Sequence, residues 1–258
     1  MKRMWLLFVG MAFAATMTAQ TKIPVGTVIP VELESVMNAG KVHPGQAITA
    51  KVAQDVPLDN AMKIKAGSRV MGEVVEATPA NGAPTIAFRF DKIEMNGQTI
   101  PVRTDLRAIA SRLEVETAQT DVTGDDRGSD PPWAQTVNQI GGNDTVYREE
   151  GTIDEGDHVV GKAVYAGNWG ALAPVASTPD GPCRGAVAGN NSPQALWVFS
   201  HDACGVYGYT AKIVHAGRND PQGRIELAST GGALKLHPGS ALLLRVNGEP
   251  ASNQEASR

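Results

Sequence analysis

The chain has 258 residues, of which 42% are apolar and only 5% aromatic, and its formal net charge is −4. This length and composition are typical of a globular protein with one large domain or two smaller ones. The mild negative charge argues against nucleic acid as a partner, because phosphate backbones are bound through clustered Lys and Arg. The 28 Gly and 16 Pro predict many turns, and therefore short strands rather than long helices.

Residues 1–20 differ from everything that follows. Lys2 and Arg3 precede an unbroken apolar run, after which small and polar residues lead up to Gln20. This order is typical of a cleaved secretory signal peptide. The run is shorter than the about 20 apolar residues of a permanent transmembrane anchor, and no cysteine follows it to carry a lipid. We therefore expect cleavage near Ala19 or Gln20 and export to the periplasm or the outer membrane.

One short pattern occurs four times along the chain. An apolar residue precedes a turn that closes on Gly, often with Pro before it, and a strand-like run follows. The copies lie at residues 23–33, 42–52, 64–74 and 236–246. Pro presets φ and Gly accepts the positive φ of a tight turn, so each copy predicts a turn leading into a strand. His43 and His237 stand directly before Pro-Gly, and we interpret them as turn neighbours rather than metal ligands.

Residues 21–106 predict a meander of antiparallel strands. Apolar and polar residues alternate in several runs, as in strands with one buried and one solvated face. Asn96-Gly97 between two such runs is the strongest short signal for a hairpin. Gly72 inside the third strand predicts a bend or bulge that lets the sheet curl.

The remaining residues complete an all-β prediction. Residues 107–157 are acidic and rich in turn formers, so we expect a linker or loop there. Residues 158–221 regain strand-like runs, at 159–165, 195–200 and 207–215, and are expected to form an inserted β subdomain. Residues 222–247 again show the strand-like runs and turns of the meander. Residues 248–258 are expected to form a disordered tail. The predicted fold is a barrel of short antiparallel strands, from residues 21–106 and 222–247, interrupted by the β-rich insertion.

Both cysteines, Cys183 and Cys204, lie in the predicted insertion. Disulfides persist in exported proteins, so we expect the two thiols to pair. Closing this segment contributes about 3 kcal/mol on chain-entropy grounds. Neither cysteine has a second thiol at the spacing of a zinc site, which argues against a metal.

Four segments support a comparison with a known family. They are Ile23-Pro24-Val25-Gly26-Thr27-Val28-Ile29-Pro30-Val31, Pro44-Gly45, Val52-Ala53-Gln54-Asp55-Val56 and Ala66-Gly67-Ser68-Arg69-Val70-Met71-Gly72-Glu73. Residues 23–77, and more loosely 225–246, resemble the β-barrel domain of TrbI-like proteins, the scaffold of the outer-membrane core in conjugation and type IV secretion systems. The resemblance implies a barrel and a place in the cell envelope. The stalk and the helical antenna of that family have no counterpart here, so a role as a secretion-channel subunit is not implied.

The residue types that support catalysis or metal binding occur without a convincing arrangement. His201, Asp202 and Cys204 are close in sequence, but neighbours in a strand point to opposite faces, and a disulfide explains Cys204 better than a Cys-His hydrolase. A second set, the acids Asp121, Asp125, Asp126 and Asp130, lacks the spacing of a calcium loop. Glu32 and Glu34 share a strand face at about 7 Å, but this face is the solvated one. We predict no catalytic residue, no metal and no cofactor.

Four aromatic residues of the insertion have two open interpretations: Trp169, Trp197, Tyr207 and Tyr209. Exposed, they would stack on sugar rings or seat an apolar partner segment. Buried, they would supply the core that a small insertion needs, and we favour this second interpretation.

The leading functional hypothesis is a non-enzymatic protein of the cell envelope, a structural or binding module that contacts a protein or a glycan. Two alternatives stay open. One is an exported hydrolase acting on polysaccharide or peptide, with His201, Asp202 and the acidic loop as its groups. The other is an oligomeric, ring-forming subunit of an envelope assembly, because barrels of the resembled family assemble side by side.

Overall fold

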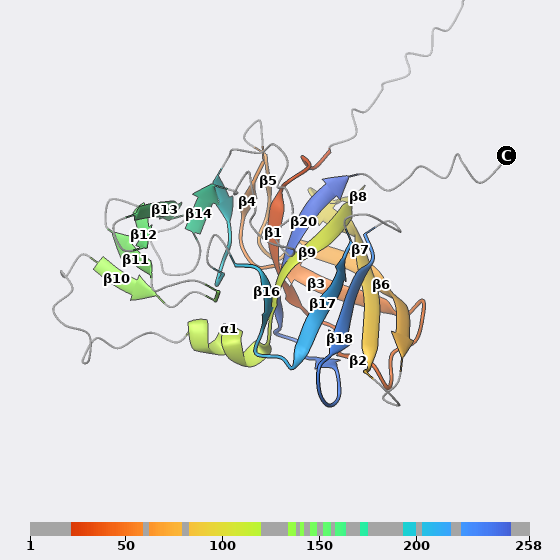
Figure 1. Ribbon diagram of the computed structural model, residues 1–258. Helices are drawn as coiled ribbons and strands as arrows, with labels where there is room; N and C mark the ends of the chain where they lie inside the picture. The colour runs from red at the N-terminus through yellow and green to blue at the C-terminus, as the bar shows by residue number, and fades with distance from the viewer. Residues whose placement is uncertain are drawn as a thin grey trace, which may run out of the picture.

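The computed structural model describes residues 22–58, 62–78, 83–119, 134–137, 140–141, 145–148, 152–155, 158–163, 171–174, 193–199, 203–217 and 223–248. Strands dominate these residues, and α1 (Arg112–Ala118) is the single helix among them (Figure 1). The predicted all-β class is therefore confirmed for the described part of the chain. No helix there has the length and hydropathy that crossing a membrane requires.

The largest of the four sheets in the described residues joins the beginning of the chain to its end. Its strands, in spatial order, are β16 (Gly205–Tyr207), β9 (Arg103–Ala110), β20 (Ala241–Gly248), β1 (Val28–Leu33), β3 (Ala47–Val52), β6 (Arg69–Thr78), β7 (Thr85–Met95), β18 (Ile225–Ser229) and β17 (Ala211–Ala216), with β8 (Gln98–Pro101) paired to β7. All pairs are antiparallel except β16 with β9. Because β20 pairs with β1 and β9, and β18 with β7, the predicted pairing of the first and last segments is confirmed.

The predicted turns are present at each copy of the repeat. Gly26, Gly45, Gly67 and Gly239 have φ values of 93°, 81°, 79° and 86°. The Asn96-Gly97 hairpin also forms, with both residues at positive φ between β7 and β8. A register shift between β6 and β7 lies between Met71 and Gly72, which confirms the predicted bulge.

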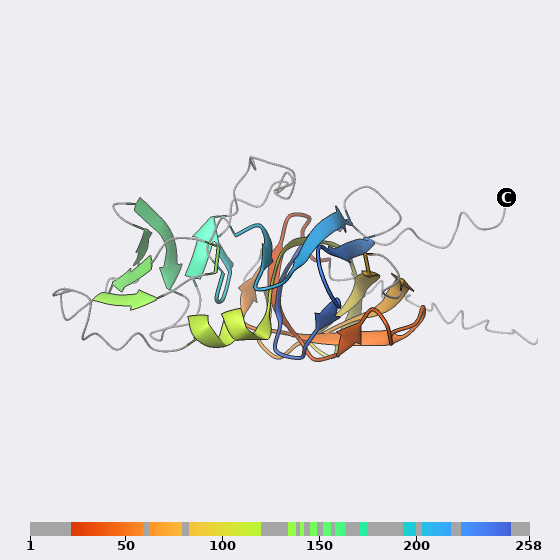
Figure 2. The ribbon, with the colours of Figure 1, turned by 60° about the horizontal axis from the view of Figure 1, so that its bottom comes forward.

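The large sheet curls round on itself (Figure 2), and the side chains that fill its interior are apolar. The beginning of β9 faces β7 and the ends of β17 and β18. We call this line of contact the seam; residues 102–104 lie on one side of it, and residues 90–91, 217 and 223 lie on the other. Val102 N–H donates to Asp91 O at 2.9 Å, and Thr104 Oγ1 donates to Phe90 O at 3.0 Å. No ladder joins β16 to β17 in the described residues, so the paired path is open and the closed barrel stays a prediction.

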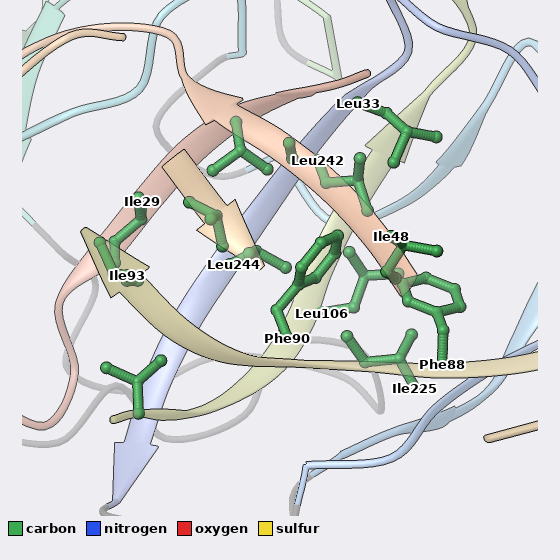
Figure 3. Close-up of a cluster of buried hydrophobic side chains, with 14 of the residues drawn as sticks. Ile29, Leu33, Ile48, Phe88, Phe90, Ile93, Leu106, Ile225, Leu242 and Leu244 are labelled. Carbon is green, nitrogen blue, oxygen red and sulfur yellow. The ribbon is translucent and has the colours of Figure 1, made fainter. Parts of the chain in front are cut away.

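The first core fills the inside of the curled sheet with alternate residues of its strands (Figure 3). Ile29, Ile48, Phe88 and Leu242 are all fully buried there. The rings of Phe88 and Phe90 meet edge to face, with centroids 5.9 Å apart. This geometry adds to the stabilisation that burial of the two rings provides.

A second core lies on the opposite face of β1, β9 and β20. It is covered by α1 together with residues 196–199 and 203, which we call the second layer. Ala108 and Leu243 point to this layer, and the buried Asp105–Arg245 ion pair lies on the same two strands. Strands buried on both faces carry nearly continuous apolar runs. Within the segment expected to be a linker or loop, residues 107–110 instead belong to β9 and residues 112–118 to α1, because their apolar side chains are buried in this core.

The smaller sheet contains six antiparallel strands: β10 (Ala134–Val137), β11 (Thr145–Arg148), β12 (Thr152–Glu155), β13 (His158–Ala163), β14 (Ala171–Pro174) and β15 (Pro193–Ala195). It lies beside the large sheet, on the side of α1 and β16 (Figure 1). Three of these strands fall in the segment expected to be a linker. The predicted strand at 207–215 is interrupted at Gly208, which has φ 69°, and becomes β16 and β17.

The residues of the predicted insertion are thus divided between the two sheets. β16 and β17 join the large sheet because Val206, Tyr209 and Ile213 pack against its interior. The predicted domain boundaries themselves stay predictions. Two short pairs complete the strands: β2 (Met37–Asn38) with β19 (Lys235–Leu236), and β4 (Val56–Pro57) with β5 (Lys63–Ile64).

Candidate functional site

The pair β2–β19 brings two distant parts of the chain together at one end of the curled sheet. Leu236 lies opposite Met37 and Lys235 opposite Asn38. Met37 and Leu236 are fully buried in the first core. Lys235 is exposed and the Asn38 side chain is half-buried, so this pair separates the apolar interior from a polar outer surface.

A hollow of about 210 Å³ lies on that surface, and we call it the basic pocket. Its lining residues are Val36, Asn38, Lys41, Val42, Gln46 and Lys235. Val42 and Gln46 flank the His43-Pro44-Gly45 turn of the second repeat copy, and Lys235 directly precedes the fourth copy. The pocket therefore lies where the second and fourth copies of the turn motif begin, and the second copy contributes two of its lining residues.

Backbone hydrogen bonds hold the lining of the basic pocket in place. Lys41 N–H and Val42 N–H both donate to Asn38 O, at 2.8 and 2.9 Å. The Asn38 side-chain oxygen accepts from Gly40 N–H at 3.0 Å. With its oxygen engaged in this way, the Asn38 amide has its NH₂ group to offer as a donor. Gln46 N–H donates to His43 O at 3.1 Å, which closes the turn.

The electrostatics of the basic pocket are set by its two lysines. Lys41 and Lys235 are exposed, and neither ammonium group forms an ion pair with a described residue. By contrast, Lys51 pairs with Glu32 at 3.3 Å on the outer face of the sheet. No Asp or Glu belongs to the lining. Two like charges at one small hollow produce a positive potential that attracts an anion.

The basic pocket also has an aliphatic wall. Val36 is 49% exposed, which places it among the few large apolar side chains that the described residues leave open to solvent. Val42 is half-buried and packs against the first core. The arrangement as a whole offers two ammonium groups, two carboxamides and a small apolar surface. It suits binding of an anionic group attached to a small aliphatic body.

The predicted aromatic site residues lie away from this pocket. Trp197 is 5% exposed in the second core, where its backbone N–H donates to Gln54 Oε1 at 3.1 Å. Tyr207 packs against the same core; its hydroxyl donates to Cys204 O at 2.9 Å and accepts from Cys204 N–H at 3.0 Å. Tyr209 packs against the first core, and burial raises the pKa of its hydroxyl. Trp169 lies outside the described residues.

The remaining candidates do not assemble a site in the described residues. Glu32 is engaged with Lys51, and His43 Nδ1 lies 3.2 Å from the neighbouring Pro44 O. The described residues contain no group of three or more His, Cys, Asp or Glu with metal-binding geometry. Cys183, His201, Asp202 and the acidic loop lie outside the described residues. The disulfide of Cys183 with Cys204 therefore stays a prediction.

The basic pocket was missed at the level of sequence, although a signal for it exists. Lys41 to Gly45 reads Lys-Val-His-Pro-Gly, and Lys235 to Gly239 reads Lys-Leu-His-Pro-Gly. In both copies a lysine thus stands two residues before the His-Pro-Gly turn. Only the β2–β19 pairing shows that the two copies meet at one place.

Comparison of the chain with family models, with curated proteins and with solved structures found no match.

Proposed function

We propose that the chain is an exported, non-enzymatic binding module of the cell envelope, in which the curled sheet is the scaffold and the basic pocket takes an anionic group of a protein or glycan partner. One observation carries the proposal. The β2–β19 pair places Lys41 and Lys235, each of which directly precedes a copy of the turn motif, at a single hollow without an acid in its lining. A binding role requires only what this pocket offers, namely charge, amide donors and an aliphatic wall.

The scaffold of this proposal is a closed barrel of the TrbI-like kind. Its support is the seam, where Gly217 and Gly223, at φ 88° and 84°, lie against Thr104 O so closely that an added Cβ would stand 2.9 Å from it. Asn247 Nδ2 donates to Gly217 O at 3.1 Å across the same line. Contacts of this kind bring the edges of the sheet together without a regular ladder.

Export is proposed from the pattern of residues 1–20. The test is fractionation of cells that express the full chain, followed by N-terminal sequencing of the purified protein. We expect a mature protein that begins near Gln20 or Thr21 and carries the Cys183–Cys204 disulfide. Recovery of the intact chain from the cytoplasm, with Met1 or Lys2 at its N-terminus, would contradict export.

Binding at the basic pocket is tested by an NMR titration of the full chain with acetate and with phosphate at low ionic strength. We expect amide shifts at Lys41, Val42, Gln46 and Lys235 that saturate, and loss of these shifts in the Lys41→Gln/Lys235→Gln double variant. Lys212→Gln is the matched control, because Lys212 is an exposed lysine on β17 outside the pocket lining. Shifts that persist in the double variant, or that appear elsewhere, would exclude the pocket as the binding site.

A further inference from the structure

We infer that the ligand of the basic pocket is a carboxylate borne by a small aliphatic group. This inference rests on the proposed binding function and specifies the chemistry of its ligand. It is argued from three properties of the lining: the kind of cation, the kind of apolar surface and the size.

The cationic groups of the pocket suit a carboxylate better than a phosphate. Lysine ammonium groups bind carboxylates and phosphates alike, but phosphate sites typically add backbone N–H donors from a helix N-terminus or a glycine-rich nest. All six lining residues belong to short strands, turns and connections, and none is Gly. The backbone N–H groups of Lys41 and Val42 are already bonded to Asn38 O. What remains is a set of side-chain donors with the charge of two lysines.

The apolar part of the lining favours an aliphatic group over a sugar ring. Sugar rings are commonly recognised by stacking on aromatic faces, and the lining contains no aromatic residue. Val36 and Val42 instead present branched aliphatic surface, and Val36 is 49% exposed. A bound aliphatic group that covers Val36 would remove this apolar surface from water.

The size of the pocket limits the ligand to one small group. Its volume of about 210 Å³ is below the range of roughly 300–1,000 Å³ that is typical of pockets for drug-sized molecules. A short branched acid has this size, and so does the last residue of a peptide with its terminal carboxylate. Both sources share the chemistry that the lining recognises.

The test is an NMR titration of the full chain with four probes: N-acetyl-valine, isovalerate, N-acetyl-valine amide and inorganic phosphate. We expect at least one of the two carboxylates to bind about tenfold more tightly than the neutral amide and than phosphate, with shifts at Lys41 and Lys235. Tighter binding of N-acetyl-valine than of isovalerate assigns the site to a peptide C-terminus. Equal or tighter binding of isovalerate assigns it to a free short-chain acid.

Two other outcomes overturn the inference, and they separate it from the proposed function. If phosphate shifts the pocket residues at concentrations as low as the carboxylates do, the carboxylate assignment is wrong while the anion-binding function stands. If the neutral amide binds as tightly as the carboxylates, or if none of the four probes shifts the pocket residues, both fail.

A pair of valine variants tests the aliphatic wall. Val36→Ser is expected to weaken isovalerate binding about threefold, because its branched carbons lose their apolar contact, while acetate binding stays unchanged. Val214→Ser is the matched control, since Val214 on β17 is 52% exposed and lies outside the lining. Equal isovalerate affinity of the wild-type chain and of Val36→Ser would show that the wall takes no part in binding.

Discussion

Gly72 determines, as a single residue, how closely two central strands approach. It lies at the bulge between β6 and β7, and an added Cβ would stand 1.8 Å from Arg89 O. The sequence predicted a bulge from a glycine within a strand-like run. It did not indicate the close carbonyl contact, because that contact depends on the partner strand. Gly72 is therefore needed for two reasons: the contact with Arg89 O leaves no room for a side chain, and the bulge curves the sheet.

Gly72→Ala is expected to destabilise the protein by about 2–4 kcal/mol, since the backbone of β7 must shift to relieve the clash. The measurement is chemical unfolding of the purified chain at equilibrium. Gly231→Ala is the control, because no atom lies within 4 Å of its added Cβ. Equal loss of stability in both variants would show that the contact with Arg89 O has no special cost.

Asp55 organises the hairpin of β4 and β5 through a charge that is sensitive to pH. Its carboxylate accepts a hydrogen bond from Lys63 Nζ, and it accepts another from Ala66 N–H at 2.9 Å. The bond from Lys63, and then that from Ala66, lower the pKa of Asp55 below its usual value of 3.8. Because the folded-state pKa is the lower one, the stabilisation is fully present above pH 3.8. It is lost as the pH falls through the folded-state pKa.

Asp55→Asn is therefore expected to lower stability by about 0.5 kcal/mol at pH 7, a small value because the ion pair is partly exposed. The amide still accepts the bond from Ala66, so the substitution isolates the charge. The difference from the wild type should shrink in unfolding curves recorded below pH 3.8. A difference that stays constant from pH 7 down to pH 3 would contradict the assigned role of the carboxylate.

At the scale of elements, the second layer is attached to the large sheet through a few polar contacts. Trp197 has φ 55°, an unusual backbone conformation for a bulky side chain. Gln54, which is 3% exposed, accepts the hydrogen bond from Trp197 N–H. A second contact joins Arg107 Nε to Ala203 O at 3.1 Å. The layer therefore depends on buried acceptors and donors as well as on apolar packing.

Gln54→Met keeps the size of the side chain but removes the acceptor, which leaves Trp197 N–H buried without a partner. We expect a loss of about 1–3 kcal/mol. In hydrogen exchange, the amides of residues 196–199 should exchange faster, while those of β3 and β6 keep their protection. Uniformly faster exchange over the whole chain would show that Gln54 supports the large sheet rather than the layer.

Elements that depend on local signals were predictable from the sequence, and elements that depend on distant partners were not. The four turns and the Asn96-Gly97 hairpin follow from Gly and Asn at positions that require positive φ, with Pro before the Gly in several turns. The second layer was not predicted, because Leu196 to Phe199 are buried by residues distant in the sequence, on β1, β9, β20 and α1. The basic pocket was missed for the same reason, since Lys41 and Lys235 are almost 200 positions apart in the chain.

At the scale of the whole molecule, the seam decides whether the large sheet acts as one closed unit. Gly217 and Gly223 approach Thr104 O from the ends of β17 and β18.

Gly217→Ala is expected to destabilise the protein by about 1–3 kcal/mol, because of the positive φ of Gly217 and its contact with Thr104 O. Thermal unfolding checks this value, with Gly232→Ala as control, because Gly232 has φ 76° but no atom within 4 Å of an added Cβ. Equal effects would mean that the seam contact adds nothing to the cost of the backbone conformation.

In the proposed function, the curled sheet is the scaffold and the basic pocket beside the β2–β19 pair binds the partner. Lys41 and Lys235 are then expected to act together on one bound anion. Attraction between exposed charges in water is weak and screened by salt, so each lysine is expected to contribute about 0.2–1 kcal/mol at low ionic strength.

The most direct measurement is calorimetric titration of N-acetyl-valine into the wild type, Lys41→Gln, Lys235→Gln and the double variant, at two salt concentrations. We expect each single variant to weaken binding about twofold to fivefold at low salt, the double variant to weaken it further, and added salt to reduce these differences. Single variants that bind with wild-type affinity at low salt would contradict a shared anion site between the two turns.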